Sequence, residues 1–323
     1  MQAFKLSLPD GKTVSGLHSI PSAAADNGEA GPRPVYRPLL VGLHGGCFSS
    51  AYFDVDDYSA RHVSAATGVP FVAIDRPGYV DTSPVETIPE TSSFHQEWGT
   101  FLHRTILPAL WDEFGVLNGC SSIALHCHSL GAPGGCVAAA LHGGEASPAY
   151  ALAAVTISGF GNAVSNLRTK DFTPPDDPPP PTISFPYHIK DALMFPPGTA
   201  DPDVLAQTAH LDRPMPYREM ADMRSRWLAT WRDSFAGQIR APVLIALAGR
   251  DGLWLTGDED LREYAAAFTG SRRVEGSVIP GAPHNLEMSY WSQGWYARVF
   301  GFAMEGAASL AIGNGSGEAP AER

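Results

Sequence analysis

The feature that most constrains the fold of this chain is a series of short, continuous apolar runs that alternate with helical segments. The runs are PLLVGLH (38–44), FVAID (71–75), SIALHC (122–127), LAAVTISGF (152–160), PVLIALAG (242–249) and RVEGSVIPG (273–281). Runs of this kind are typical of strands buried on both faces of a parallel sheet, with helices as the crossover connections. We therefore predict an α/β fold.

Two more strands are expected at the N-terminus. Alternating runs at residues 4–8 and 13–20 flank the turn Pro9-Asp10-Gly11, which predicts an antiparallel hairpin at the sheet edge. The prediction is then a mostly parallel sheet of about eight strands, flanked by helices. Helices are expected at about 92–114, 130–142, 258–268 and 288–304.

A long insertion interrupts the alternation at residues 161–238. It opens with the proline-dense run KDFTPPDDPPPPTISFP (170–186), which is excluded from regular helix and central strand because proline fixes φ and lacks an amide hydrogen. Its second half, 217–235, has helical spacing of apolar residues. We expect a cap, or lid, the alternative being an irregular surface loop with one packing helix. The predicted division is a core of 1–160 and 239–308, a cap at 161–238 and a disordered tail at 309–323.

Composition limits the classes of partner. The net charge is −12, and the 22 basic residues form no cluster, which argues against nucleic acid. A neutral or apolar small-molecule substrate is expected, and the oligomeric state stays open. The sequence has neither a leader pattern nor an apolar stretch of membrane-spanning length, which predicts no membrane association and a cytoplasmic location. No CxxC pair occurs, so we expect neither a zinc site nor a disulfide framework, and no other metal or organic cofactor is expected; the cysteines are Cys47, Cys120, Cys127 and Cys136.

The strongest local signal for chemistry is SIALHCHSLGAPGG (122–135), an apolar strand that runs into Ser129 and then into a helix of small residues. A strand–nucleophile–helix turn holds a serine in strained backbone geometry and exposes its hydroxyl at the top of a sheet. The residues two positions before and two positions after the serine must be small, because the turn brings them close together. Gly131 meets this requirement, whereas Cys127 departs from the usual glycine. On its own, a close-packed structural turn explains the pattern equally well.

A serine nucleophile needs a base and an acid, which in such a sheet follow it along the chain in the order acid, then histidine. Asp251 comes directly after the strand 242–249, and His284 follows the last predicted strand. Asp251 could instead cap the next helix, and Asp258, Glu259 and Asp260 compete for the acid role from that helix. Of the 11 histidines, His284 alone lies beyond the acid loop.

A pair of glycines after the strand 38–44 completes the candidate site. In LHGGCF (43–48), the amide of Gly46 or Cys47 could join that of Leu130 to bind an oxyanion; a structural glycine pair is the alternative. The predicted substrate pocket contains His44, Cys47, His128 and Trp227. The cap aromatics wall an apolar pocket or form the cap's own core; they are Phe185, Tyr187, Phe195, Trp227 and Trp231.

Taken together, five phrases resemble the α/β-hydrolase family over nearly the whole chain: LHGG (43–46), AIDRPGY (73–79), HCHSLG (126–131), AGRDG (248–252) and APHN (282–285). Val80 departs from the glycine that many relatives have after the tyrosine. The proline-rich insertion is similar to that of small hydrolases of fungal secondary-metabolite pathways. Serine at position 129 argues against the haloalkane and epoxide hydrolases of the family, whose nucleophile is a carboxylate.

The resemblance implies a serine hydrolase that acts on an ester, thioester or lactone. Because the same family includes carbon–carbon bond hydrolases, lyases and cyclases, an alternative is carbon–carbon cleavage or cyclisation, with His284 or His128 acting on substrate protons. A second alternative is a non-catalytic binding protein on the same fold.

Overall fold

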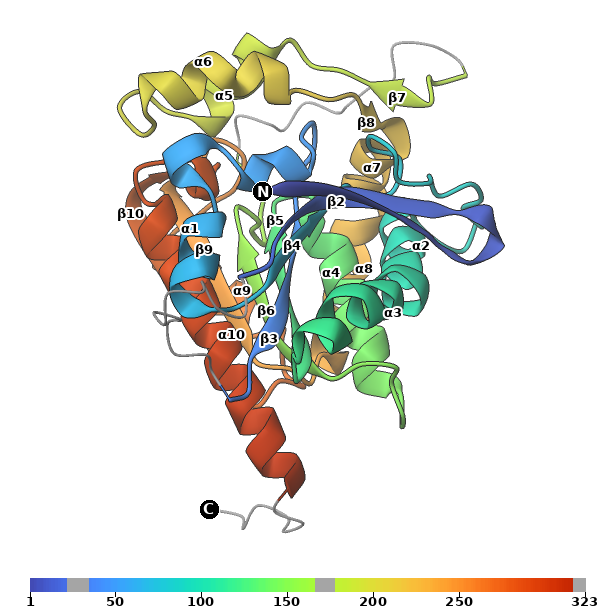
Figure 1. The fold of residues 1–323 in the computed structure, drawn as a ribbon. Coiled ribbons are helices and arrows are strands. Elements are labelled where there is room, and N and C mark those ends of the chain that lie inside the picture. Colours follow the sequence, from blue (N-terminus) through green and yellow to red (C-terminus); the bar gives the residue numbers. More distant parts are fainter. Residues whose placement is uncertain (22–34, 166–177, 316–323) are drawn as a thin grey trace.

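An eight-stranded sheet forms the centre of the molecule in this computed structural model, which describes residues 1–21, 35–165 and 178–315 (Figure 1). The strand order is β1-β2-β4-β3-β5-β6-β9-β10. The β1–β2 and β2–β4 pairs are antiparallel, and all other pairs are parallel. The predicted fold is therefore confirmed. The strands are β1 (Gln2–Ser7), β2 (Thr13–Ser19), β3 (Pro38–Leu43), β4 (Phe71–Ile74), β5 (Ser122–His128), β6 (Leu152–Ser158), β9 (Val243–Arg250) and β10 (Val274–Pro283).

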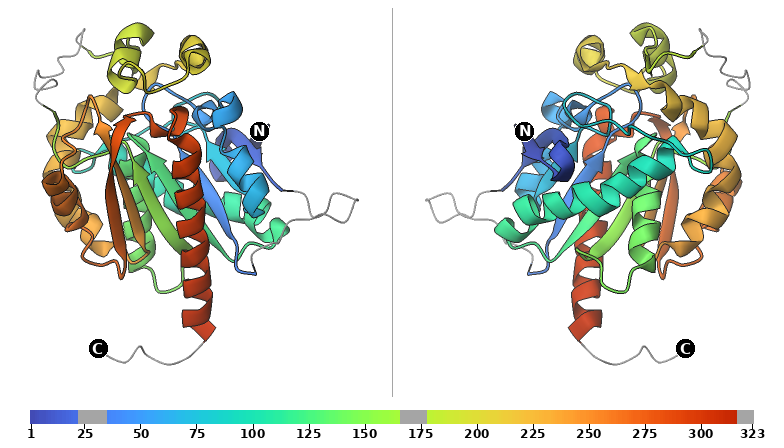
Figure 2. Two further views of the ribbon diagram at one scale, coloured as in Figure 1. Left: turned by 90° about the vertical axis from the view of Figure 1, so that its left-hand side faces the viewer. Right: turned by 90° about the vertical axis from the view of Figure 1, so that its right-hand side faces the viewer.

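Helices cover both faces of the sheet, as the two side views show (Figure 2). Every residue of β3, β4, β5 and β6 is buried, which explains their uninterrupted apolar runs. One face carries α1 (Arg61–Thr67) and α10 (Ser292–Gly315). The other face carries α2 (Phe94–Phe101), α3 (Leu107–Leu110), α4 (Gly131–Gly144), α8 (Leu228–Ser234) and α9 (Asp258–Ala265).

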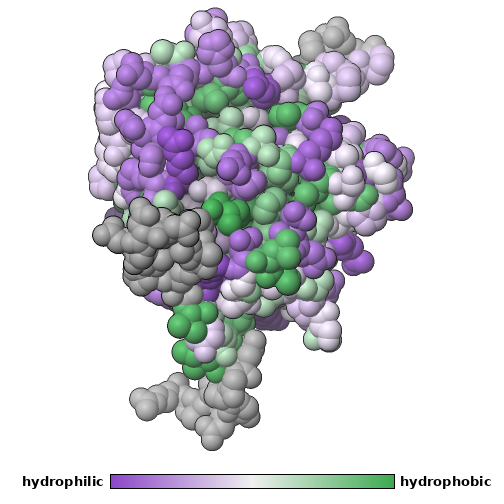
Figure 3. Space-filling model, viewed as in Figure 1, coloured by the Kyte–Doolittle hydropathy of each residue, from purple (hydrophilic) through white to green (hydrophobic). Residues whose placement is uncertain are grey.

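The two faces have separate hydrophobic cores because successive side chains of a strand point to opposite sides. In β3, Leu39 and Val41 contribute to the core under α2 and α4, whereas Leu40 contributes to the core under α10. On the face that Figure 3 shows, apolar residues lie in separate areas between polar ones. Within the described part of the chain, no helix is both long and apolar enough to cross a bilayer.

The insertion forms more regular structure than its composition predicts. Helices α5 (Tyr187–Met194) and α6 (Pro202–Leu211) stand above the carboxyl ends of the parallel strands (Figure 1). Proline opens α6 at its first turn, where an amide hydrogen has no helical partner, and Asp201 caps it. Strands β7 (Thr182–Ile183) and β8 (Met215–Pro216) pair, and α7 (Tyr217–Asp222) leads into α8. The first half of the proline-dense run lies outside the described residues.

The final helix is longer than the sequence predicts. Helix α10 extends to Gly315, so the prediction of a disordered tail from residue 309 is wrong for 309–315. Leu310 and Ala311, which favour helix, continue α10 into this stretch. The remaining tail, 316–323, lies outside the described residues.

Acid is expected to destabilise this fold through His95 on α2. This histidine is fully buried, and its Nε2 donates to the backbone oxygen of Glu219 on α7 (3.0 Å). Burial, assisted by the charge of Arg76, lowers the pKa of His95 from 6.5 to about 3. As the pH falls, His95 is therefore protonated near pH 6.5 in the unfolded chain but only near pH 3 in the folded chain. The contribution of His95 to the free energy of unfolding is fully present above pH 6.5. It decreases as the pH falls toward 3, and about 3 kcal/mol is lost at pH 4.

Urea unfolding at pH 7 and pH 4 tests this expectation, with His95→Gln as the non-titrating comparison. The free energy of unfolding of the wild type should exceed that of the variant at pH 7, and the difference should shrink by about 3 kcal/mol at pH 4. A difference that does not change with pH would contradict the role of His95.

Candidate active site

Ser129 occupies a strained turn between β5 and α4. Its φ is 49°, in the left-handed region that non-glycine residues avoid. Two hydrogen bonds hold the strain: the Ser129 amide donates to the Ser158 oxygen and its own oxygen accepts from the Ala132 amide, both at 2.9 Å. The turn leaves the hydroxyl at the carboxyl edge of the sheet, the geometry that a serine nucleophile needs.

The residues around this turn are small because the backbones approach closely. A Cβ on Gly131 would lie 2.3 Å from the Leu43 oxygen, so no larger residue fits. Cys127, which stands in place of the usual glycine, lies against Gly135 of α4. A Cβ on Gly135 would lie 2.4 Å from the Cys127 sulfur. The missing side chain in the helix thus makes room for the one in the strand.

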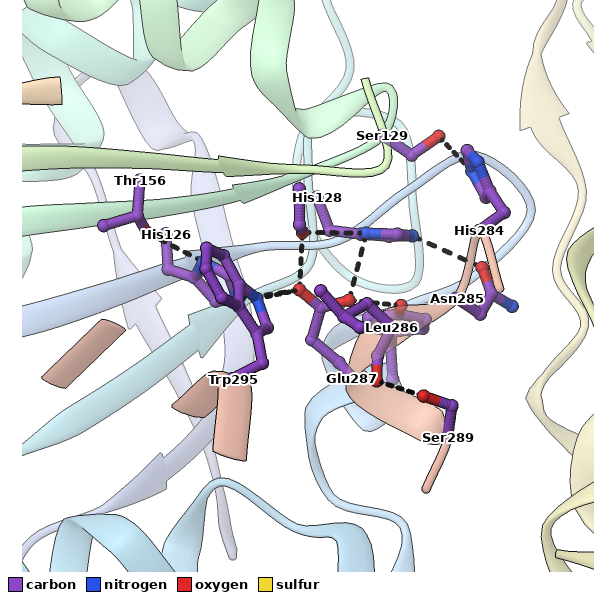
Figure 4. Close-up of polar contacts among 12 residues, drawn as sticks. His126, His128, Ser129, Thr156, His284, Asn285, Leu286, Glu287, Ser289 and Trp295 are labelled. Atoms are coloured by element: carbon purple, nitrogen blue, oxygen red, sulfur yellow. Dashed lines mark hydrogen bonds and ion pairs between the residues drawn. The ribbon is translucent and has the colours of Figure 1, made fainter. Parts of the chain in front are cut away.

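The structure brings Ser129, His284 and Asp251 together at this edge (Figure 4 shows the first two). His284 Nε2 lies 3.0 Å from the Ser129 hydroxyl, and His284 Nδ1 lies 2.8 Å from Asp251 Oδ2. The imidazole and carboxylate side chains are each 1% exposed. Because the carboxylate accepts a hydrogen bond from the Nδ1–H group, Nε2 carries no proton and is free to accept the serine proton.

Asp251 is held in place by its own loop. Its other oxygen accepts hydrogen bonds from the amides of Leu253 (2.7 Å) and Trp254 (3.1 Å). The competing acids Asp258 and Asp260 lie in the first turn of α9, and Asp260 accepts from the Gly257 amide at the start of that helix. Asp251 is thus the carboxylate that contacts the imidazole.

The glycine loop after β3 lies against the serine turn. A Cβ on Gly45 would be 3.0 Å from Ser129 Cβ, and one on Gly46 would be 2.6 Å from the Leu130 side chain. The amides of Gly46 and Leu130 therefore belong to neighbouring segments beside Ser129. The next residue, Cys47, has a φ of 60°, and its oxygen accepts from the Arg213 amide (3.1 Å) and the Lys190 ammonium (3.4 Å). The role of the two amides as oxyanion donors stays a prediction.

Three of the four predicted pocket residues are enclosed by protein atoms. His44 is fully buried; its Nδ1 donates to the Gly45 oxygen (2.7 Å) and its Nε2 accepts from the Arg76 amide (3.1 Å). Burial holds the pKa of His44 well below its usual range. The imidazole therefore supports the glycine loop from behind, which corrects its assignment to the pocket.

His128 and Trp227 need the same correction. His128 is the last residue of β5 and points to the α10 face of the sheet, where it stacks on Tyr52 with 4.6 Å between ring centroids. Trp227 packs against His95, Trp231 and Phe235 in the core below α8, because its helical stripe faces the sheet. The fourth predicted residue, Cys47, is 4% exposed and belongs to a small apolar cluster beside Gly46.

The family follows from the fold and from one comparison. A model of the alpha/beta hydrolase family matches residues 40–298. The chain belongs to the alpha/beta hydrolase family. No curated protein matches it by sequence. Among the described residues, no group of three or more His, Cys, Asp or Glu side chains is placed to hold a metal ion.

Solved structures agree with this family in fold. A soluble variant of monoglyceride lipase from Saccharomyces cerevisiae has a TM-score of 0.60 at 14% identity, covering 92% of this chain and 93% of that one. A carboxyl esterase from Bacillus coagulans has a TM-score of 0.59 at 14% identity (97% and 98% covered). A putative epoxide hydrolase from Pseudomonas aeruginosa has a TM-score of 0.57 at 17% identity (96% of this chain and 97% of that one covered). At such identities the likeness concerns the fold.

Two buried polar clusters of this α/β hydrolase have no local signal in the sequence. In one, Arg76 donates to Glu219 of α7 and to the Leu130 oxygen (3.2 Å), and the Tyr79 hydroxyl donates to Glu219 (2.6 Å). This cluster connects α7 of the insertion to the serine turn through hydrogen bonds. The other surrounds Glu287, three residues after His284. Both join residues more than a hundred positions apart, which is why sequence reasoning missed them.

Proposed function

We propose that this α/β hydrolase is a serine hydrolase that cleaves an ester, thioester or lactone of a small, largely apolar substrate. The observation that carries the proposal is the continuous hydrogen-bonded chain from the Ser129 hydroxyl through His284 to Asp251. This arrangement activates a hydroxyl that is otherwise a poor nucleophile at neutral pH.

The mechanism starts with attack of Ser129 Oγ on the acyl carbon while His284 Nε2 takes the hydroxyl proton. Asp251 stabilises the imidazolium that forms. The amides of Leu130 and Gly46 hold the oxyanion, and losing one such donor costs roughly 3 kcal/mol of barrier. His284 then gives its proton to the leaving group, and the same base activates the water that hydrolyses the acyl enzyme.

An apolar substrate is supported by the surroundings of the glycine loop. Met215 Cε would lie 3.7 Å from a Cβ on Gly46. Ile183 of β7 and Met215 of β8 belong to an apolar cluster there, so the insertion places apolar side chains beside the proposed oxyanion donors. The cluster consists of Cys47, Tyr79, Ile183, Met215 and Tyr217, with Leu130, Phe185, Met220 and Ala221 packed against it.

The position of His128 makes it unsuitable as a proton carrier for the alternative reaction, carbon–carbon cleavage or cyclisation. A proton carrier needs a ring nitrogen that faces the substrate, but His128 Nδ1 faces Glu287 at 3.1 Å and its Nε2 faces Asn285 at 3.3 Å. Such chemistry would have to use His284 alone, whose position beside the serine hydroxyl suits acyl transfer better.

A fluorophosphonate probe and a series of p-nitrophenyl esters test the proposal. The probe should label Ser129 and no other residue, as peptide mass spectrometry would show. From acetate to butyrate, kcat/KM should rise about tenfold because each buried methylene contributes about 0.8 kcal/mol. Absence of both labelling and ester turnover would refute the proposed function, and preference for acetate would refute the apolar site.

A further inference from the structure

The buried carboxylate of Glu287 lies behind the serine turn, among polar side chains (Figure 4). Burying a carboxylate costs several kcal/mol unless hydrogen bonds compensate for the lost water. Its Oε1 lies 2.5 Å from the Ser158 hydroxyl, 2.8 Å from Trp295 Nε1 and 3.1 Å from His126 Nε2, and its Oε2 lies 2.8 Å from the Tyr52 hydroxyl and 3.1 Å from His128 Nδ1.

These contacts keep the carboxylate charged. Burial alone would raise the pKa of Glu287, but its interactions with His128 and His126 outweigh burial and hold that pKa well below the usual range. Burial has the larger effect on His128 and lowers its pKa. The carboxylate is therefore held as an anion, with His128 Nδ1 facing it at 3.1 Å.

The carboxylate is linked to the nucleophile by two routes. His128 directly precedes Ser129 in the chain. Ser158 donates its hydroxyl to Glu287, and its backbone oxygen accepts the Ser129 amide at 2.9 Å. The end of β5 and the end of β6 are thus both fixed to the same charge.

Glu287 is linked to the triad base through its own loop. It follows His284 by three residues and lies in the short turn Leu286–Met288. His128 Nε2 lies 3.3 Å from Asn285 Oδ1, next to His284. A Cβ on Gly159 would be 2.6 Å from His128 Cε1 and 3.0 Å from the His284 oxygen, so the loop and the imidazole are packed without space between them.

We propose that Glu287 is a positioning residue, which clamps the loop of His284 to the strand end of Ser129 and thereby sets the distance between imidazole and hydroxyl. The inference rests on the proposed function and adds a residue to it. Glu287 touches no reacting atom. A shift of about 1 Å between reacting groups can cost roughly a hundredfold in rate, so a fixed distance here has a measurable effect.

Glu287→Gln tests the proposal with a substitution of nearly equal size. The amide keeps one acceptor but turns an N–H toward the donors of Tyr52 and His128. We expect kcat for p-nitrophenyl butyrate to fall about 30- to 100-fold per active site, with KM within about twofold. Active sites are counted by exhaustive fluorophosphonate labelling and mass spectrometry, so misfolded molecules do not enter the rate.

Asp222→Asn is the matched control. Asp222 is also a buried carboxylate, which accepts from the Phe94 amide (2.7 Å) and pairs with Arg218, within α7 and α2. Its variant should lose thermal stability but keep kcat per labelled site within about twofold. An equal loss in both variants would show that buried charge in general, and not this clamp, supports activity, and would overturn the proposal.

Ser158→Ala is the milder variant, and it decides the question if Glu287→Gln does not fold. It removes one donor and leaves the backbone bond to Ser129 intact; we expect a three- to tenfold loss of kcat per site. Combined with Glu287→Gln it should add no further loss, because the hydroxyl acts through the carboxylate. Full kcat per labelled site in either single variant would overturn the positioning role. A wild-type enzyme that neither takes the probe nor cleaves the ester would reject the proposed function, and this role with it.

Discussion

Ser129→Ala is expected to lower kcat/KM for p-nitrophenyl butyrate by roughly 10⁴- to 10⁶-fold and to abolish fluorophosphonate labelling. The substitution removes one oxygen, the atom that would attack the acyl carbon. It leaves the backbone bonds of the turn to Ser158 and Ala132 in place. Circular dichroism and thermal unfolding should therefore match the wild type while turnover is lost.

Ser122→Ala provides the matched control at the other end of the same strand. Ser122 is buried, and among the described residues its hydroxyl has no hydrogen-bond partner. Removing it should leave kcat/KM within about twofold. Undiminished turnover in the Ser129 variant would show that the serine does not attack, and the proposed mechanism would be wrong.

Asp251→Asn is expected to reduce kcat by about 10⁴-fold at neutral pH. The asparagine has the same shape, but its amide can donate to His284 Nδ1, which places the imidazole proton on Nε2, where the serine proton must go. KM should change little, because the carboxylate holds the base and not the substrate. Steady-state kinetics with p-nitrophenyl butyrate measures both constants.

Asp260→Asn separates the two candidate acids. Asp260 accepts from the Gly257 amide at the start of α9, so its variant should lose at most about 1 kcal/mol of stability with unchanged kcat. A large loss of kcat in the Asp260 variant, with the Asp251 variant active, would reverse the assignment.

The sheet could be predicted from the sequence because its strands are buried on both faces and so leave continuous apolar runs. Helices α5 and α6 could not be predicted in the same way. Proline is abundant there, and whether it prevents a helix depends on its place: at the first turn of α6 it is compatible with the helix. Composition alone does not distinguish these cases.

The candidate triad could be predicted because strand ends of a parallel sheet meet at one edge, so Ser129, Asp251 and His284 had to approach one another. The surroundings could not. His44 and His128 stand beside glycine or serine at strand ends, which suggests access to a substrate, but the structure encloses both. Glu287 has partners from four separate segments, and no local pattern indicates such convergence.

The contact between Cys127 and Gly135 shows that the tightness of a nucleophile turn is a property of two positions and not of one. The space between strand and helix there holds one side chain, so one of the two facing positions must be glycine. Glycine at 127 combined with alanine at 135 should pack as well as the natural pair, whereas alanine at 135 alone should not. A sequence search that requires glycine two residues before the serine will therefore overlook hydrolases in which the space-making glycine lies in the helix instead.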